Sequence, residues 1–336
     1  MQPVGCSPGT MVKRPNRKVK VRKAHVKYES IRASMVVRYK VAVRKFFAFL
    51  AMFHLAIPGS FEDLDAQAGE YINFLYLDDR PLSWASDFLC GLKRLYPRSR
   101  RHLDTASSWF RFWQKGTVRH RALALTGELA RAMAAIAFLE SNRQLGTAIL
   151  LGFVALLRSG ELVALKKEDV TIMQRGAVAA ISLPASKGAL RSGNPELVLV
   201  YDRSVVQLLS ALQSELEDGA LFFPGGWSKL AEGLRSLARV FGLPGDAITP
   251  YSLRRGGATW HFQTYCSYDA TQEAGRWQER RTAKIYVDLA VADAAAFSLP
   301  PWGERRLHRA VAALPQLLEE ACHGRRARGL GWGGLA

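Results

Sequence analysis

The sequence predicts a mainly α protein with a small β-sheet, and two observations indicate this fold class. The chain has 336 residues, 49% of them hydrophobic, which is enough for about two domains with separate cores. Apolar residues recur at helical spacing over most of the chain, whereas short runs rich in Val, Ile and Leu occur between residues 170 and 201. We therefore expect an all-helical domain, a polar linker at 116–121 and then a mixed domain.

Charge points to a polyanionic partner. The chain has 47 Lys and Arg against 29 Asp and Glu, a net charge of +18, with a sequence pI near 10.1. Nucleic acid is the leading candidate.

The four cysteines, Cys6, Cys90, Cys266 and Cys322, are far apart. This spacing excludes a small disulfide scaffold and a local zinc knuckle, and it favours a reducing compartment.

Two segments indicate where in the cell the protein is located. The longest apolar run, Ala148 to Leu157, is about half the length of a bilayer span, so we expect a buried core helix and no membrane partner. Residues 1–27 are predicted to be a basic, disordered arm. Phosphate contact or nuclear import is one interpretation and a merely soluble tail is the other. We expect a nuclear protein if the source is eukaryotic, and a cytoplasmic one otherwise. The arm's basic residues are Lys13, Arg14, Arg17, Lys18, Lys20, Arg22, Lys23 and Lys27.

The first domain, residues 28–117, is expected to hold several helices. Helix-breaking signals at Pro58, Pro81 and Pro97 separate them. Ser60 is a candidate N-cap with Asp63 in the first turn, where a negative charge favours the positive end of a helix. A later segment carries four aromatic residues at helical spacing, which we expect to fill a core rather than stack on bases. They are Trp109, Phe110, Phe112 and Trp113.

The second domain, residues 118–300, mixes helices with strands. Apolar patterning predicts helices at 126–140, 146–157, 204–216 and 228–241, and strands at 170–173, 177–183 and 196–201. The last two strands form a predicted hairpin with a long basic tip at 184–195, where Lys187 lies. Residues 301–336 are expected to form a C-terminal helix and tail, with Pro315 breaking or kinking the helix.

Two arginine-containing segments are candidates for binding an anion. Arg158 follows the apolar helix directly, with Glu161 one turn further on; a surface ion pair is the alternative. Thr249 and Pro250 are typical of a helix start. On that helix Tyr251 shares a face with both Arg254 and Arg255, so helical geometry does not choose between the arginines. An exposed basic helix start is the alternative to a phosphate site there.

The order of these segments resembles the catalytic domain of the tyrosine recombinase (phage integrase-like) family over residues 120–295. Trp277 and Tyr286, nine residues apart, complete the pattern. Residues 28–113 are more loosely similar to the family's helical core-binding domain. The resemblance implies a helical core-binding, DNA-binding domain, an α+β catalytic domain and the site roles that follow. These are Arg158 and Arg254 as catalytic arginines, Glu161 as the nearby acid, Lys187 as the mobile lysine, Tyr251 at the usual histidine position, Trp277 at the His/Trp position and Tyr286 as nucleophile.

The resemblance also implies a reaction. Tyrosine recombinases cut and rejoin double-stranded DNA through a covalent 3′-phosphotyrosine intermediate, without metal, ATP or another cofactor, and we expect a homo-oligomer, a tetramer, on DNA. The C-terminal helix would then dock on a neighbouring protomer, or else pack on its own domain. Such enzymes are typical of mobile elements.

One residue departs from the family pattern. Tyr251 replaces the usual histidine, and a phenol with a reference pKa of about 10 is a poor base at neutral pH. His261 does not substitute, because a helix from Tyr251 to His261 spans about 15 Å. Two other hypotheses therefore stay open. One is a protein of the same fold that binds DNA without cutting it. The other is a basic RNA-binding or scaffold protein, in which the matched positions would lie far apart.

Overall fold

The computed structural model describes residues 33–117, 122–173, 176–184, 194–287 and 299–323. The basic arm and most of the hairpin tip, with Lys187, lie outside the described residues. Contacts between residues divide the chain into two compact units, Met1–Arg119 and His120–Ala336. Each unit has its own hydrophobic core, as two domains require.

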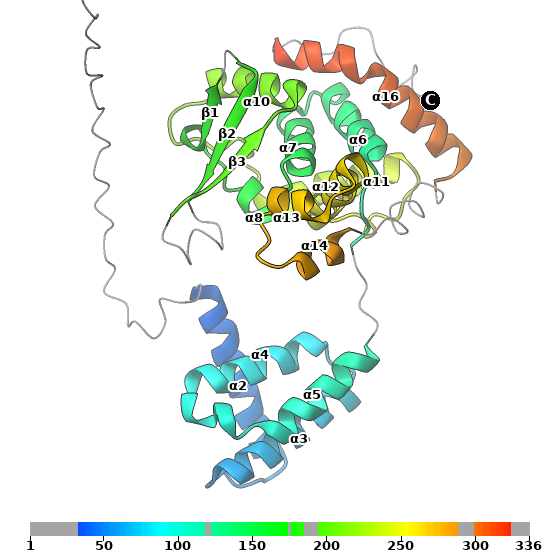
Figure 1. Cartoon of the computed structure of the whole chain (residues 1–336). Coiled ribbons are helices and arrows are strands. Elements are labelled where there is room, and N and C mark those ends of the chain that lie inside the picture. The colour runs from blue at the N-terminus through cyan, green and yellow to red at the C-terminus, as the bar shows by residue number, and fades with distance from the viewer. Residues whose placement is uncertain (1–32, 118–121, 174–175, 185–193, 288–298, 324–336) are drawn as a thin grey trace, which may run out of the picture. The chain divides into compact units, whose positions relative to one another are not determined.

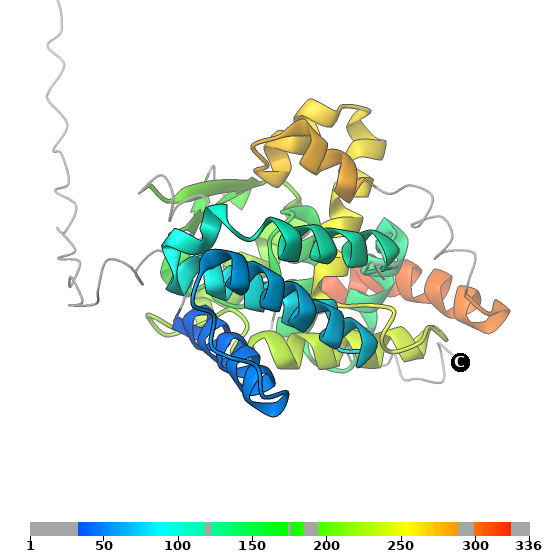
Figure 2. The same ribbon diagram turned by 90° about the horizontal axis from the view of Figure 1, so that it is seen from below.

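The first unit is a bundle of α-helices, shown in blue to cyan in Figures 1 and 2. Its helices are α2 (Ala33–Met52), α3 (Phe61–Leu77), α4 (Leu82–Leu95) and α5 (Asp104–Gly116), with a 3-10 turn at Pro97–Arg101. Ser60 caps α3 as predicted: its hydroxyl accepts from the Asp63 N–H, and the Asp63 carboxylate accepts from the Ser60 N–H. The rings of Phe46, Tyr71 and Phe88 pack at the centre.

The prediction that all four aromatic residues of α5 fill a core is wrong for two of them. Phe110 and Trp113 pack against the core of the unit. Phe112 is 80% exposed, and Trp109 is 39% exposed beside Gly69. The reason is geometric, because residues three apart share a helix face and consecutive ones do not. The run of four aromatic residues therefore divides between the two faces of the helix.

The second unit has a helical core with a small sheet beside it (Figure 1). Its helices are α6 (Gly127–Leu139), α7 (Arg143–Val154), α8 (Ser159–Leu162), α10 (Arg203–Glu215), α11 (Gly226–Val240), α12 (Pro250–Tyr265), α13 (Tyr268–Gly275), α14 (Arg280–Tyr286) and α16 (Pro301–Cys322). A 3-10 turn at Lys167–Asp169 precedes the strands. Helix α7, which contains most of the predicted apolar run, is buried along most of its length.

The sheet is antiparallel, in the order β1 (Val170–Met173), β2 (Val178–Leu183), β3 (Glu196–Val200). Ala179 pairs with Val200, so β2 and β3 form the predicted hairpin. Along β3 the side chain of Val198 is buried and that of Leu199 is exposed. This alternation places one face of the strand on the core and leaves the other face open.

The end of α7 differs from the prediction, and the start of α12 and the end of α13 place residues of the candidate site. The apolar helix ends at Val154, not at Leu157, because Leu156 adopts a left-handed backbone conformation with φ 48°. Arg158 therefore does not close that helix but is the N-cap residue of α8. Helix α12 begins as predicted, after Thr249, whose N–H donates to the Ser252 hydroxyl. Helix α13 ends at Gly275, and its C-cap residue Arg276 is also left-handed, with φ 56°.

Helix α16 packs on α6 and α10 of its own unit (Figure 1). Its buried residues include Leu307, Leu314 and Leu317, which join the main core. Of the two outcomes predicted at Pro315, the break is wrong, since the helix continues through it to Cys322, and the kink stays a prediction. A proline inside a helix costs about 3 kcal/mol, and burial of apolar side chains on both sides of Pro315 offsets this cost. Among the described residues, no helix combines the length and apolar character needed to span a membrane.

Candidate active site

Arg254 lies at the centre of the candidate site. It is on the first turns of α12 and has no exposed surface. Its Nη1 donates to the carbonyl of Leu156, and its Nη2 donates to the carbonyl of Gly275 at 2.5 Å. Both carbonyls stand where a helix ends, after α7 and in the last turn of α13. The guanidinium therefore uses carbonyl oxygens left without helical partners and ties three elements together.

Two aromatic rings lie beside this guanidinium, and a third lies next to one of them. The Cζ of Arg254 is 4.9 Å from the centroid of the Trp277 ring and 5.6 Å from that of Tyr286. The Trp277 and Tyr286 rings are 4.5 Å apart, and those of Tyr251 and Tyr286 are 5.6 Å apart. Four positions matched by family resemblance thus lie within one cluster, although 35 residues separate the first from the last.

The structure distinguishes the two adjacent arginines of α12. Arg255 is also buried, but its Nη1 donates to the carbonyl of Ala122 at 2.8 Å. It therefore contacts the segment before α6, while Arg254 contacts the aromatic cluster. An exposed basic helix start is wrong for both residues, because Arg255 is only 2% exposed and Arg254 not at all.

Arg158 and Glu161 form a close, partly buried ion pair. The backbone N–H of Arg158 donates to Glu161 Oε2 at 2.9 Å, and Arg158 Nη1 donates to Oε1 at 2.5 Å. The Arg158 side chain is 29% exposed and that of Glu161 is 7% exposed. A simple surface pair does not fit these values. Burial of Glu161 makes its cationic partners necessary, since an unpaired buried carboxylate is costly.

Arg276 and Glu196 also belong to this network, and sequence reasoning assigned them no role. Arg276 Nη2 donates to Glu161 Oε2 at 2.7 Å, and its Nε is 3.4 Å from Glu196 Oε2. Arg158 Nη1 is 3.8 Å from the same Glu196 oxygen. The position of Arg276 directly before Trp277 was the available signal. No sequence signal pointed to Glu196, because it lies on a strand that is far from the other site residues in sequence.

Burial and neighbouring charges shift the pKa values of the cluster. Burial lowers the pKa of Arg254 to about 10, and the positive charges of Arg158 and Arg276 act in the same direction. Arg254 still keeps its charge at neutral pH. Burial raises the pKa of Tyr251 above the usual phenol range, and a hydrogen bond with Tyr286 adds to this effect. Tyr251 therefore stays neutral at neutral pH and cannot serve as a base.

Other candidate residues lie apart from the cluster or outside the described residues. Lys187 belongs to the undescribed hairpin tip. His261 Nδ1 is hydrogen-bonded to the Thr271 hydroxyl at 3.0 Å, and burial lowers its pKa. Among the residues that the structure describes, no group of three or more His, Cys, Asp or Glu side chains is arranged to hold a metal ion.

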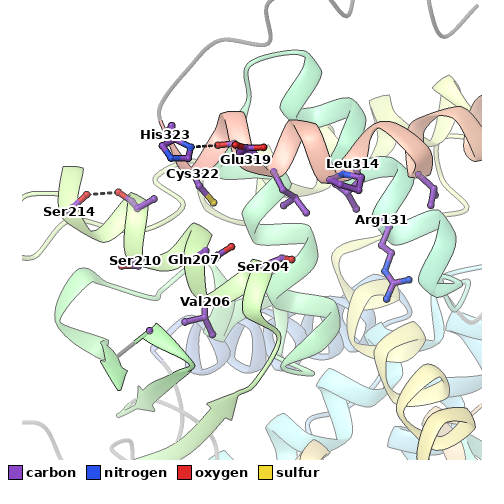
Figure 3. A pocket seen from close by; sticks show the side chains of 15 residues that line it. Arg131, Ser204, Val206, Gln207, Ser210, Ser214, Leu314, Glu319, Cys322 and His323 are labelled. Carbon is purple, nitrogen blue, oxygen red and sulfur yellow. Dashed lines mark hydrogen bonds between the residues drawn. The ribbon is translucent and has the colours of Figure 1, made fainter. Parts of the chain in front are cut away.

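Among the hollows that described residues of the second unit line, two differ in whether they reach the site. One, of about 630 Å³, runs between β3 and α12–α13 and is lined by Leu156, Leu199, His261 and Arg276 among others. It therefore borders the arginine cluster. The other, of about 890 Å³, lies between α10 and α16 (Figure 3). Gln207 and Ser210 line one side of it and Leu314 the other, and no proposed site residue reaches it.

Comparison with known proteins identifies the fold. Neither the scan against protein-family models nor the search of curated proteins gives a match for the sequence. Among solved structures, the chain is similar to a lambda integrase dimer bound to a COC′ core site, with TM-score 0.53 and 18% identity over 77% of this chain and 90% of that one. It is also similar to the Tn1549 transposon integrase in complex with transposon right end DNA, with TM-score 0.51 and 13% identity over 79% and 92% of the two chains. The chain thus has the tyrosine recombinase and integrase fold.

Proposed function

We propose that this chain is a site-specific DNA recombinase or integrase that cuts and rejoins double-stranded DNA through a covalent 3′-phosphotyrosine bond at Tyr286. The observation that carries the proposal is the packing of the Tyr286 ring beside the Arg254 guanidinium, at 5.6 Å, within this fold. The two similar integrase structures are complexes with DNA, which supports the same partner here. We further propose that the protein acts as a homo-oligomer, a tetramer, on DNA of a mobile element, in the nucleus if the source is eukaryotic.

The charge of the cluster fits one phosphodiester. Arg158, Arg254 and Arg276 bring three positive charges, and Glu161 and Glu196 bring two negative ones. The remaining positive charge equals the charge of a single phosphodiester with opposite sign. Guanidiniums match phosphate oxygens in shape and stabilise charge that develops during displacement. Removal of one such contact typically lowers the rate about 10²-fold to 10³-fold.

The cleavage step exchanges one bond at phosphorus for another and moves two protons. The Tyr286 oxygen bonds to phosphorus while the bond from phosphorus to the 5′ oxygen breaks. The Tyr286 phenol gives its proton to solvent water, because Tyr251 is not a base, and the leaving 5′ oxygen gains a proton from Lys187, the proposed donor. Trp277 packs beside the phosphate, Tyr251 donates a hydrogen bond to it, and Glu161 holds Arg158. The phosphotyrosine keeps the bond energy for rejoining, so the step consumes no metal or ATP.

A trapping experiment tests the proposal without knowledge of the target site. The probe is a pool of duplexes of random central sequence, each with one nick placed so that the released strand dissociates after cleavage. We expect wild-type protein to give complexes that survive denaturation by detergent, and Tyr286→Phe to give none. Equal trapping by both proteins, or none by wild type, would contradict the proposal. Sequencing of the trapped DNA then reports the site.

A second candidate function is DNA binding without cleavage. The observation that favours it is the complete burial of Arg254, which also lies beside the rings of Trp277 and Tyr286, because a phosphate reaches this guanidinium only if surrounding groups move. The replacement of the usual histidine by Tyr251 also favours DNA binding without cleavage. This candidate predicts tight, salt-sensitive binding to duplex DNA in the absence of any trapped complex.

A further inference from the structure

We propose that Arg276 is a positioning residue: by holding Glu161 and Glu196, it fixes Nη1 of Arg158 and leaves the Nε–Nη2 edge of Arg158 for the phosphate. This inference rests on the proposed function. It concerns a residue outside the set of matched family positions, and it follows from the contacts and backbone of Arg276 in this structure.

The backbone of Arg276 adopts a conformation that arginine disfavours. Its φ of 56° and ψ of 43° lie in the left-handed region, where glycine is the usual residue at a helix end. Gly275 stands one residue too early to relieve this strain. Position 275 needs a glycine for a different reason, because a Cβ on Gly275 would lie 2.1 Å from the Trp277 ring. An arginine is therefore kept in a conformation that an L side chain disfavours, which points to a role for the side chain.

The side chain of Arg276 carries its charge into a mostly buried position. It is only 10% exposed, and burial lowers its pKa. A guanidinium so far from water needs anionic partners, which it has in Glu161 from α8 and Glu196 from β3. Arg276 thus joins three elements that are distant in sequence. Without it, two carboxylates on α8 and β3 would lose a shared cation.

Arg158 and Arg276 divide the two carboxylate oxygens of Glu161 between them. Arg158 Nη1 binds Oε1 of this carboxylate and Arg276 Nη2 binds Oε2. With Oε2 also accepting from the Arg158 N–H, the carboxylate cannot rotate without breaking contacts. The contacts of the Arg158 guanidinium with described residues all involve Nη1. Its opposite edge is the one with the fork shape that suits two phosphate oxygens.

The test compares Arg276→Gly with two matched controls in the trapping assay, under single-turnover conditions at saturating protein. Cys266→Gly relieves the same left-handed strain at an exposed helix end, with φ 50°. Arg143→Ala removes another mostly buried arginine, 17% exposed and 2.6 Å from Glu215. We expect Arg276→Gly to slow trapping by up to about 100-fold, because small displacements of catalytic groups have effects of that size. We expect its affinity for duplex DNA to change by less than about threefold, and its melting temperature to fall but to stay above the assay temperature, since the buried carboxylates lose a cationic partner. Both controls should trap at the wild-type rate.

Two further variants separate positioning from mere charge or folding. Arg276→Lys keeps the positive charge but lacks the planar set of donors of a guanidinium, so it should not trap DNA at the wild-type rate. Glu161→Gln combined with Arg276→Gly should be no slower than the slower single variant, because both act through Arg158. Wild-type trapping by Arg276→Gly or by Arg276→Lys would overturn the inference and leave the proposed function intact. An absence of trapping by wild type would overturn the proposed function and the inference with it.

Discussion

The indole ring of Trp277 packs against the phenol ring of Tyr286 in a tilted arrangement, with centroids 4.5 Å apart and planes inclined by 31°. Trp277 belongs to a small hydrophobic cluster with Leu156 and Ala258, and it is only 8% exposed. We predict that Trp277→Ala destabilises the second unit by about 3–5 kcal/mol, the usual cost of removing a large buried aromatic side chain. Urea unfolding measures this loss directly.

Trp277→Phe is the matched variant for the same position. It keeps an aromatic ring next to Arg254 and Tyr286 and should cost less than Trp277→Ala, because it leaves a smaller cavity. If Trp277 only fills space, this variant should trap DNA at the wild-type rate. If its indole N–H assists at the phosphate, trapping should slow while the unfolding curve hardly moves. A Trp277→Ala protein as stable as wild type would contradict the burial of the indole in this cluster.

Close packing of α12 on α7 gives a second prediction. A Cβ at Gly257 would lie 2.0 Å from the backbone oxygen of Phe153, and a backbone atom cannot move aside as a flexible side chain can. Gly257→Ala should therefore destabilise the unit by at least about 1–3 kcal/mol, as overpacking does. It should also move Arg254, three residues earlier on the helix.

Gly160→Ala is the control for this substitution. Gly160 lies in α8, and a Cβ there meets no described atom within 4 Å. This change should be neutral or stabilise the protein by up to about 1 kcal/mol, since alanine favours a helix over glycine. Chemical denaturation of both variants gives the comparison. Equal stability of the two would mean that α12 and α7 are not in close contact at Gly257.

Much of the fold was predictable because its signals are local. The pair Ser60 and Asp63 marks the start of α3, and Thr249 with Pro250 marks that of α12, since capping depends on residues a few positions apart. The hairpin was likewise predictable from two short β-branched runs. The end of α7 was not, because Leu156 takes a left-handed conformation without a glycine to announce it.

The site was predictable only in part, for the same physical reason. The matched positions came from family resemblance, and Arg254 could not be separated from Arg255 by helical periodicity. Which arginine faces the aromatic cluster depends on contacts with Leu156 and Gly275, which lie far from α12 in sequence. Arg276 and Glu161 are 115 residues apart, so no local pattern reveals their ion pair.

A third prediction concerns acid stability. Burial holds the pKa of His261 below its ordinary value of 6.5. Below that pH the unfolded chain takes up a proton that the folded imidazole resists, so stability should fall as the pH is lowered through about 6.5. The slope contributed by one proton is at most about 1.4 kcal/mol per pH unit. The contribution of His261 is measured as the difference in unfolding free energy between wild type and His261→Gln from pH 7 to pH 5. A pH-independent difference would mean that the imidazole is not protected from protonation.

The fourth prediction concerns Tyr251, which is 43% exposed and whose pKa is raised by burial and by Tyr286. A phenol that stays protonated at neutral pH acts as a hydrogen-bond donor and not as a base. Tyr251→Phe should therefore slow trapping by up to about tenfold, which corresponds to the loss of one neutral hydrogen bond.

Tyr251→His should act differently, because an imidazole with a pKa near 6.5 changes charge within the working range. Its trapping rate, divided by that of wild type at each pH between 5.5 and 8, should vary with pH. The same ratio for Tyr251→Phe should stay flat, since neither ring titrates there. A pH-dependent ratio for the phenylalanine variant would show that Tyr251 does exchange a proton in this range, and that burial beside Tyr286 does not keep its hydroxyl neutral.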